Sequence, residues 1–318
     1  MKRALITGIA GFVGSHLAEL LLSKGDYEVY GIDMPKSKDG NILHIKNKIK
    51  FFEADIKDLP SMYELIKQIE PHYIFHLAAQ PVVPYSYTAP HETLTTNIIG
   101  SLNILESIRK NNFDSVIHFA GTSEEYGLVK EEEIPIKENN PLRPQSPYSI
   151  SKVAMSNLAV QYHRSYGLKT VITRAFNHIG PRGREIFVTS DFAKQISEIE
   201  NGKKDSVIHV GNLEAKRDFT DVRDVVKAYL LSAEKCDYGE IYNICAGKSW
   251  RIGEMLDMLL KISFAKIKIE QDPTRLRQSD VPNIIGDFTK FKEKTGWYPE
   301  IPLETTMKDL LNYWRERI

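Results

Sequence analysis

Cysteine is scarce in this 318-residue sequence, where Cys236 and Cys245 are the only two. Two thiols supply neither a disulfide framework nor a zinc site, so we expect no metal and a reducing, cytoplasmic location. No apolar run approaches the ~20 residues of a membrane span, and His16, Glu19 and several glycines rule out a signal peptide at the start. The 42 basic and 42 acidic residues cancel, which favours neither nucleic acid nor an anionic membrane as a partner.

Internal repeats and low-complexity tracts are absent too, and the length suits one or two closely joined domains. The first half instead alternates short apolar segments with amphipathic ones. We expect strands at about 4–6, 28–32, 51–56, 73–77, 115–119 and 170–176, with helices at about 15–23, 59–69, 93–110 and from 147. This order predicts an α/β fold with a Rossmann-type doubly wound parallel sheet, which binds ligands at the carboxyl ends of its strands.

A glycine-rich loop, with Gly8, Gly11 and Gly14, joins the first predicted strand to the first predicted helix. Such a loop is typical of a dinucleotide site, because glycines let the backbone approach a pyrophosphate and the helix N-terminus stabilises its charge. The second strand ends at Asp33, whose carboxylate can hold both hydroxyls of an adenosine ribose and would repel a 2′-phosphate. The sequence therefore favours NAD(H), with NADP(H) possible, unless Asp33 is an ordinary turn residue.

Tyr148 and Lys152 form a second candidate feature, four residues apart where Ser146 and Pro147 predict the start of a helix. A nearby ammonium favours the phenolate, so we expect Lys152 to lower the pKa of Tyr148 toward working pH. Tyr148 would then exchange a proton with a carbinol or carbonyl oxygen. The pattern also arises by chance, and the alternative is a packed tyrosine beside a solvated lysine.

Together these motifs resemble the extended short-chain dehydrogenase/reductases. The resemblance is carried by Thr7-Gly8-x-x-Gly11-x-x-Gly14, Asp55, Ala78-Ala79, Asn97, Thr122-Ser123 and Tyr148-x-x-x-Lys152. It implies that Thr122 or Ser123 hydrogen-bonds the reacting oxygen, that Tyr148 moves the proton and that Lys152 holds the nicotinamide ribose. The expected cofactor contacts are Gly8, Gly11, Phe12, Val13, Gly14, Asp33, Asp55, Ile56, Leu77, Ala78, Ala79, Asn97, Tyr148, Lys152 and His178.

Stretches further along resemble the branch of this family that modifies GDP-mannose, at residues 123–127, 176–178, 187–189 and 211–218. Segments 179–181, 191–196, 219–224 and 242–245 resemble GDP-4-keto-6-deoxy-mannose reductases, which form GDP-D-rhamnose. Residues 122–124, Arg182 and 285–287 are similar to GDP-mannose 4,6-dehydratases. The arginines that usually follow the second strand in the dehydratases are replaced here by Asp33-Met34-Pro35-Lys36.

The resemblance implies a set of substrate contacts: Glu124, Asn177, Val188, Lys194, Arg217, Arg277 and Asp280. Asp280 stands where glutamate is common. We expect NAD(P)H-dependent reduction at C4 of a GDP-sugar, with Thr122, Ser123, Glu124, Tyr148 and Lys152 as catalytic residues. The alternative enzyme oxidises C4 and eliminates water across C5–C6, for which Glu124 would be useful. A nucleotide sensor without turnover would be favoured by loss of Tyr148 or Lys152, and both are present.

We expect a cofactor domain at residues 1–176, with segments at about 219–246 and 286–296 returning to it. A smaller C-terminal α/β domain for the nucleotide sugar would use 177–218, 247–285 and 297–318. The resemblance also implies a homodimer, formed by a four-helix bundle of two long helices from each protomer, at about 93–110 and 149–165. The loop that builds tetramers in the dehydratases is missing after Asp33.

Overall fold

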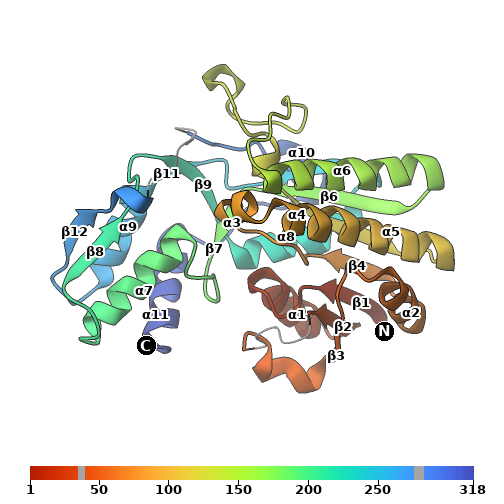
Figure 1. The fold of residues 1–318 in the computed structure, drawn as a ribbon, viewed down its shortest axis with the longest axis horizontal. Helices are drawn as coiled ribbons and strands as arrows, with labels where there is room; N and C mark the ends of the chain where they lie inside the picture. The colour runs from red at the N-terminus through yellow and green to blue at the C-terminus, as the bar shows by residue number, and fades with distance from the viewer. Residues whose placement is uncertain (35–39, 276–282) are drawn as a thin grey trace.

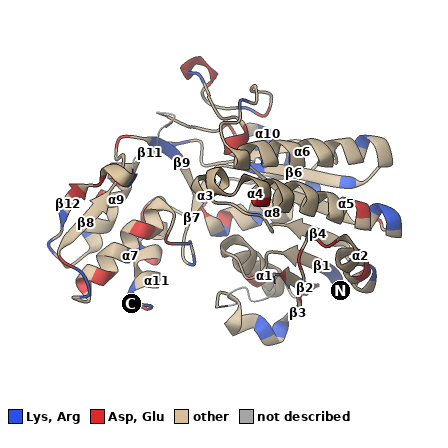
Figure 2. Cartoon of the chain, in the orientation of Figure 1, with Lys and Arg blue, Asp and Glu red and all other residues tan. Residues whose placement is uncertain are grey.

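The computed structural model describes residues 1–34, 40–275 and 283–318. A larger part contains the N-terminus and a wide sheet covered by helices, and a smaller part beside it contains the C-terminus (Figure 1). Basic and acidic residues occur along the chain in both parts (Figure 2). Among the residues described, no helix is both long enough and apolar enough to cross a bilayer.

Seven parallel strands form the large sheet, in the order β10-β6-β5-β4-β1-β2-β3. They are β1 Lys2–Thr7, β2 Tyr27–Asp33, β3 Lys50–Glu53, β4 Tyr73–His76, β5 Val116–Thr122, β6 Lys169–Ala175 and β10 Ile241–Ile244. The strand order reverses between β1 and β4, and ligands bind such sheets at this reversal, beyond the carboxyl ends of the strands. The predicted doubly wound parallel sheet is confirmed.

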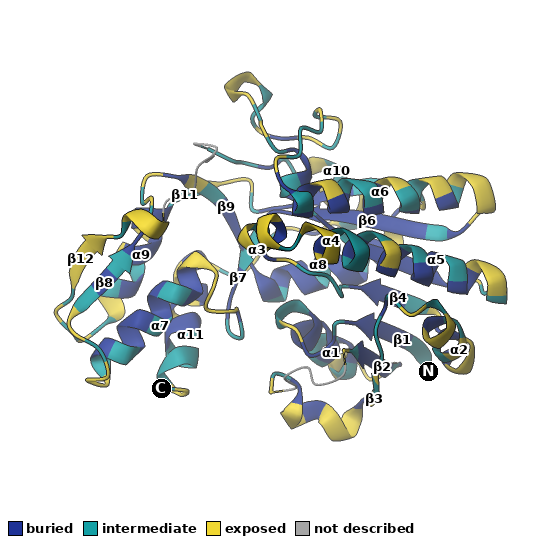
Figure 3. Cartoon of the chain, viewed as in Figure 1, coloured by how far each residue is buried: buried dark blue, intermediate teal, exposed yellow. Residues whose placement is uncertain are grey.

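Helices bury apolar side chains on both faces of this sheet (Figure 3). In β1, Ala4 and Ile6 pack on one side while Leu5 packs on the other, because successive strand residues point to opposite faces. The first side is covered by α1 Phe12–Lys24 and α8 Val222–Lys235, together with α10 Thr289–Thr295. The second side is covered by α2 Leu59–Ile69, α5 Gly100–Asn111 and α6 Pro147–Tyr166.

Two predicted elements differ from the structure for local reasons. The third strand ends at Glu53 rather than at 56, because the Asp55 carboxylate accepts the N–H of Lys57 at 2.9 Å and turns the chain. The single helix expected over 93–110 is α4 Pro90–Leu94, a π-helical turn η2 Thr95–Ile99, and α5. A helix α3, Val83–Thr88, precedes them.

The smaller part holds two short sheets and three helices around a core of its own. One sheet has β11 Ser249–Arg251, β9 Lys216–Asp221 and β7 Asn177–Ile179, and the other has β12 Lys268–Gln271 and β8 Val207–Val210. The helices are α7 Val188–Glu200, α9 Ile252–Ile262 and α11 Leu303–Arg315. Short 3₁₀ turns are η1 Leu43–Lys48, η3 Ser123–Glu125, η4 Glu131–Glu133 and η5 Pro273–Arg275.

The expected polar loop after Phe176 begins instead with β7, which pairs in parallel with β9. Strand β10 lies in the segment predicted to return to the large sheet, and Phe291 of α10 packs into the core that α1 and α8 share. The exact domain boundaries stay a prediction.

Candidate functional site

The glycine loop packs too tightly for side chains at two of its three glycines. Gly8 has φ +74°, a conformation that glycine adopts without strain, and a Cβ there would lie 3.0 Å from the Cα of Ala78. A Cβ on Gly14 would lie 2.3 Å from the carbonyl oxygen of Gly8. Gly11 caps the N-terminus of α1, whose first turn carries Phe12 and Val13. These two positions therefore require glycine for the packing of the loop itself, as in the tight glycine turns that precede a helix at dinucleotide pyrophosphate sites.

Asp33, at the end of β2, turns its carboxylate toward this loop. Its Oδ2 accepts the N–H of Ala10 at 3.0 Å, and its Oδ1 accepts the N–H of Met34 at 2.9 Å. Asn41 supports the same loop by donating to the carbonyl of Ala10 at 3.1 Å. The charge of Asp33 is thus held beside the glycine loop, and its contact with an adenosine ribose stays a prediction.

The segment after β4 is fixed by two polar side chains from other elements. The Thr7 hydroxyl accepts the N–H groups of Leu77 and Ala78 at 3.2 and 3.1 Å. The buried Asn97 amide accepts from the N–H of Gln80 at 2.8 Å and donates to its carbonyl at 3.1 Å and to Ser151 at 2.9 Å. In this structure Asn97 joins the strand end to α6, through the π-helical turn that carries it.

Thr122, at the end of β5, lies near Tyr148, and their catalytic roles stay a prediction. Helix α6 begins where the Ser146 hydroxyl accepts the N–H of Ser149 at 3.1 Å, which places Tyr148 in its first turn. The Thr122 side chain lies close enough to the Tyr148 phenol to lower its pKa. Lys152, one turn later, donates to the carbonyl of Ala120 at 2.8 Å. Tyr148 and Lys152 are both buried, with 8% and 5% of their surface exposed.

The expectation that Lys152 lowers the pKa of Tyr148 is wrong for this structure. Burial raises the pKa of Tyr148 well above its usual value, the nearby Glu124 raises it further, and only the Thr122 side chain opposes them. Burial also lowers the pKa of Lys152 to about 8, against the attraction of Glu125. The phenol of Tyr148 therefore keeps its proton at neutral pH.

The turn η3 brings three further groups to this strand end. Ser123 is buried with 9% of its surface exposed. Glu124 is partly exposed and donates its N–H to the Thr122 hydroxyl at 3.3 Å, with its carboxylate close enough to act on Tyr148. Glu125, which the motifs did not single out as a site residue, is fully buried and pairs with Arg174 at 2.8 Å.

The glycine-loop helix and the smaller part meet at stacked rings. Phe12 and His178 lie with centroids 5.9 Å apart and an interplanar angle of 15°. The His178 ring is oriented by its Nδ1, which lies 3.0 Å from the carbonyl of Phe176. Phe12 of α1 and His178 of β7, both predicted cofactor residues, therefore lie against each other. Asn177 precedes His178 on β7.

The predicted substrate residues are less closely gathered. Val188 is 37% exposed at the start of α7. Lys194 is bonded to Glu185, and Arg217 donates to the carbonyl of Lys216 at 2.8 Å. Arg277 and Asp280 lie outside the described residues. The contacts of this set with a sugar nucleotide stay a prediction.

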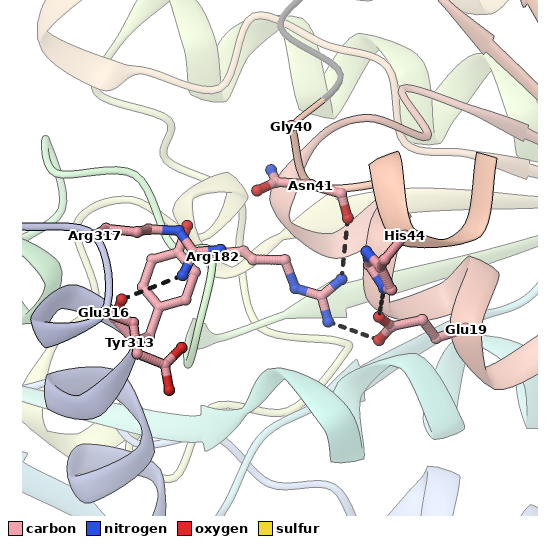
Figure 4. Close-up of a pocket in the computed structure, with 8 residues that line it drawn as sticks. All are labelled: Glu19, Gly40, Asn41, His44, Arg182, Tyr313, Glu316 and Arg317. Atoms are coloured by element: carbon pink, nitrogen blue, oxygen red, sulfur yellow. Dashed lines mark hydrogen bonds and ion pairs between the residues drawn. The ribbon is translucent and has the colours of Figure 1, made fainter.

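A hollow of about 230 Å³ lies elsewhere, between α1, residues 40–44 and the end of α11 (Figure 4). Its lining residues, Glu19, Gly40, Asn41, His44, Arg182, Tyr313, Glu316 and Arg317, do not include the predicted catalytic ones. Arg182 reaches across it to Glu19 at 2.6 Å and to the carbonyl of Asn41 at 3.4 Å. Arg182 therefore joins the loop before α7 to the larger part.

Metal-binding clusters of three or more His, Cys, Asp or Glu side chains do not occur in the described part of the chain.

Comparison with known proteins agrees with this geometry. The profile of the family described as GDP-mannose 4,6 dehydratase matches residues 5–310. A GDP-6-deoxy-D-mannose reductase from Pseudomonas aeruginosa is 31% identical over 317 residues, covering 100% of this chain and 98% of that protein. A GDP-mannose 4,6-dehydratase from Yersinia enterocolitica is 34% identical, covering 98% and 93%. A solved structure of RMD from Pseudomonas aeruginosa complexed with NADPH has a TM-score of 0.88 at 29% identity, covering 100% of both chains.

Proposed function

This chain belongs to the GDP-mannose 4,6 dehydratase family of extended short-chain dehydrogenase/reductases, and we propose that it is an oxidoreductase acting at C4 of a GDP-hexose. The preferred reaction is the NAD(P)H-dependent reduction of GDP-4-dehydro-6-deoxy-D-mannose to GDP-D-rhamnose. The likeness to a GDP-6-deoxy-D-mannose reductase along the whole chain supports this substrate class. The tight glycine loop at Gly8 and Gly14, before the N-terminus of α1, fits a nicotinamide dinucleotide, which when bound would supply the hydride for C4.

The likeness to a GDP-6-deoxy-D-mannose reductase along the whole chain carries the choice of reduction, and the buried Tyr148 is the group that would supply its proton. A ketone that becomes an alcohol needs one proton on its oxygen, so its catalytic acid must hold a proton beforehand. Burial and Glu124 raise the pKa of Tyr148, which keeps the phenol in that form. Thr122 lies beside the phenol, and in this scheme its hydroxyl donates to the same carbonyl oxygen.

The alternative is a 4,6-dehydratase, and the position of Glu124 is what favours it. Elimination across C5–C6 needs a base for the C5 proton and an acid for the departing hydroxyl. The Glu124 carboxylate lies near Tyr148 and could do part of this work. Oxidation of C4 begins with removal of the hydroxyl proton, for which Tyr148 would first have to lose its own proton.

We further propose that NADH serves at least as well as NADPH, because Asp33 holds a negative charge beside the glycine loop. Two protomers would pair through α5, with the turn η2 before it, and α6, where Ile99 of η2 and Ile150 and Tyr166 of α6 leave 41%, 49% and 52% of their surfaces exposed. The two free, buried cysteines fit the reducing cytoplasm, which we propose as the location.

Two variants test the proposed reaction. Tyr148→Phe removes the proton donor with little change in volume, and we expect it to abolish nearly all reduction of the 4-keto sugar. Glu124→Gln should leave much of that activity, because reduction needs no second acid. The proposal fails if wild-type protein converts GDP-mannose to the 4-keto-6-deoxy sugar without added reductant and Glu124→Gln abolishes that conversion.

A further inference from the structure

A single buried carboxylate, that of Glu125, lies behind the strand end that carries Thr122. Its side chain is 0% exposed, and each of its oxygens is hydrogen-bonded. Oε1 accepts the N–H of Thr122 at 3.1 Å, while Oε2 accepts the hydroxyl of Ser156 at 2.9 Å and the Nε of Arg174 at 2.8 Å. All three partners donate, an arrangement that suits a carboxylate opposite the Arg174 guanidinium.

These bonds connect the two elements that carry the proposed proton chemistry. Thr122 ends β5, and Ser156 is on α6, four residues after Lys152 and eight after Tyr148. Residues at this spacing share one face of a helix. Glu125 is therefore bonded both to the backbone of Thr122 and to the helix face that presents Tyr148 and Lys152.

The surrounding residues are shaped to hold this charge. A Cβ on Gly121 would lie 2.6 Å from Oε1 of Glu125, so a larger residue there would push the carboxylate away. Arg174 is 3% exposed, lies 4.9 Å from the centre of the Tyr126 ring and donates to the Tyr126 hydroxyl at 3.3 Å. Tyr126 in turn donates to Asn243 at 2.7 Å.

Stability alone does not require such a pair. Removing two charges from water is costly, and apolar residues of similar volume often replace a buried ion pair with no loss of stability. The pair instead adds two things that an apolar pair could not: directed hydrogen bonds to Thr122 and Ser156, and a negative charge near Lys152.

We propose that Glu125 is a positioning residue, whose hydrogen bonds hold Thr122 in register with the face of α6 that presents Tyr148 and Lys152. This inference rests on the proposed function for the identity of the reaction. Glu125 touches neither the sugar nor the cofactor in this scheme, since Thr122, Ser156 and Arg174 surround its carboxylate.

The charge effect on Lys152 is assigned to Glu125, the carboxylate that acts on it, whose own pKa burial raises and the Arg174 guanidinium lowers. Lys152 acts on the imidazoles of His76 of β4 and His118 of β5. Glu124 of η3 and Tyr229 of α8 act on Tyr148, and Arg174 of β6 acts on Glu125. Burial lowers the pKa of both histidines to about 3, so they are uncharged near neutral pH. Glu125 raises the pKa of Lys152 against burial, and its loss must move that pKa downward.

Glu125→Gln is the direct test, because it keeps the size of the side chain and removes its charge. We expect kcat for the 4-keto sugar to fall about tenfold or more, with both KM values changed less than about threefold, as for a group that acts in the transition state. The basic limb of the pH–rate profile should also move to lower pH. Wild-type kcat together with a wild-type pH profile in the folded variant would overturn the proposal.

Two further variants separate positioning from stability. Glu200→Gln is the matched control, since Glu200 is also buried and pairs with Arg315 at 2.7 Å within the smaller part, on α7 and α11. It should leave kcat and the pH profile unchanged, and a comparable shift there would overturn the proposal. If Glu125→Gln does not fold, the double variant Glu125→Leu/Arg174→Met removes both charges together. It should fold and still lose kcat, and wild-type kcat in it would refute a positioning role.

An NMR titration of Lys152, which needs no catalytic turnover, tests this inference separately from the proposed function. Wild-type protein that reduces or dehydrates neither GDP-sugar would refute the function alone. Lysine labelled with ¹³C at Cε can then be titrated by NMR, with Lys152→Arg assigning the signal. Glu125→Gln, or the double variant, must lower the titration midpoint of Lys152 relative to wild type. An unchanged midpoint would refute the inference even if the enzyme is active.

Discussion

Asp33 should make NADH at least as good a cofactor as NADPH. Its carboxylate is held in place by the N–H groups of Ala10 and Met34, at 3.0 and 2.9 Å. A ribose bound to this carboxylate would bring a 2′-phosphate to within about 5 Å of it. Even with the dielectric constant of bulk water, one charge and a double charge at about 5 Å repel by about 1.7 kcal/mol. Such a repulsion corresponds to a difference of roughly 15- to 20-fold in kcat/KM.

The assay is the initial rate of NADH and NADPH oxidation at saturating 4-keto sugar. Asp33→Asn keeps the size and one acceptor oxygen but removes the charge, so it should raise kcat/KM for NADPH about tenfold relative to NADH. Asp26→Asn, in the exposed turn before β2, is the control for the change in net charge and should leave the ratio unaltered. A wild-type preference for NADPH of tenfold or more would show that Asp33 does not face the ribose.

Three further outcomes are expected. Gly14→Ala places a Cβ 2.3 Å from the carbonyl oxygen of Gly8, so it should lower the free energy of unfolding, measured in urea, by about 1–3 kcal/mol. It should also raise the KM for NADH, and a variant with neither change would contradict the tight packing of the loop. The rate of 4-keto sugar reduction should be retained below pH 8 and lost above it, because burial lowers the pKa of the Lys152 ammonium to about 8. A rate that stays constant up to pH 10 would count against a catalytic role for Lys152. Light scattering at micromolar protein should give twice 36.3 kDa, and Ile150→Glu should give the monomer; a wild-type monomer or tetramer would exclude pairing through α5 and α6.

Local sequence patterns predicted the strands and helices around the large sheet well. Strand β2 and helix α2 follow the expected segments closely, and α6 begins at Pro147, because the hydrophobic spacing, Ser146 and the proline all act within a few residues. The glycine loop was equally recognisable, since Gly8 and Gly14 serve a backbone conformation that neighbouring residues determine.

Features that depend on distant residues were not predictable in this way. Glu125 is separated from Arg174 by 49 positions, and the run Glu124-Glu125 carries no sign of which side chain is buried. The raised pKa of Tyr148 follows from burial, which the Tyr-x-x-x-Lys spacing does not report. The π-helical turn at Asn97 likewise depends on the hydrogen bonds of its amide with Gln80 and Ser151.

The path of the hydride tests the central claim most directly. GDP-4-dehydro-6-deoxy-D-mannose would be incubated with the protein and NADH or NADPH deuterated on the transferred position, and the product examined by ¹H and ²H NMR. Our account predicts one deuterium at C4 of GDP-D-rhamnose, with little product when Tyr148→Phe replaces the wild type. A product without deuterium, or conversion of GDP-mannose alone to the 4-keto-6-deoxy sugar by internal hydride return, would contradict it.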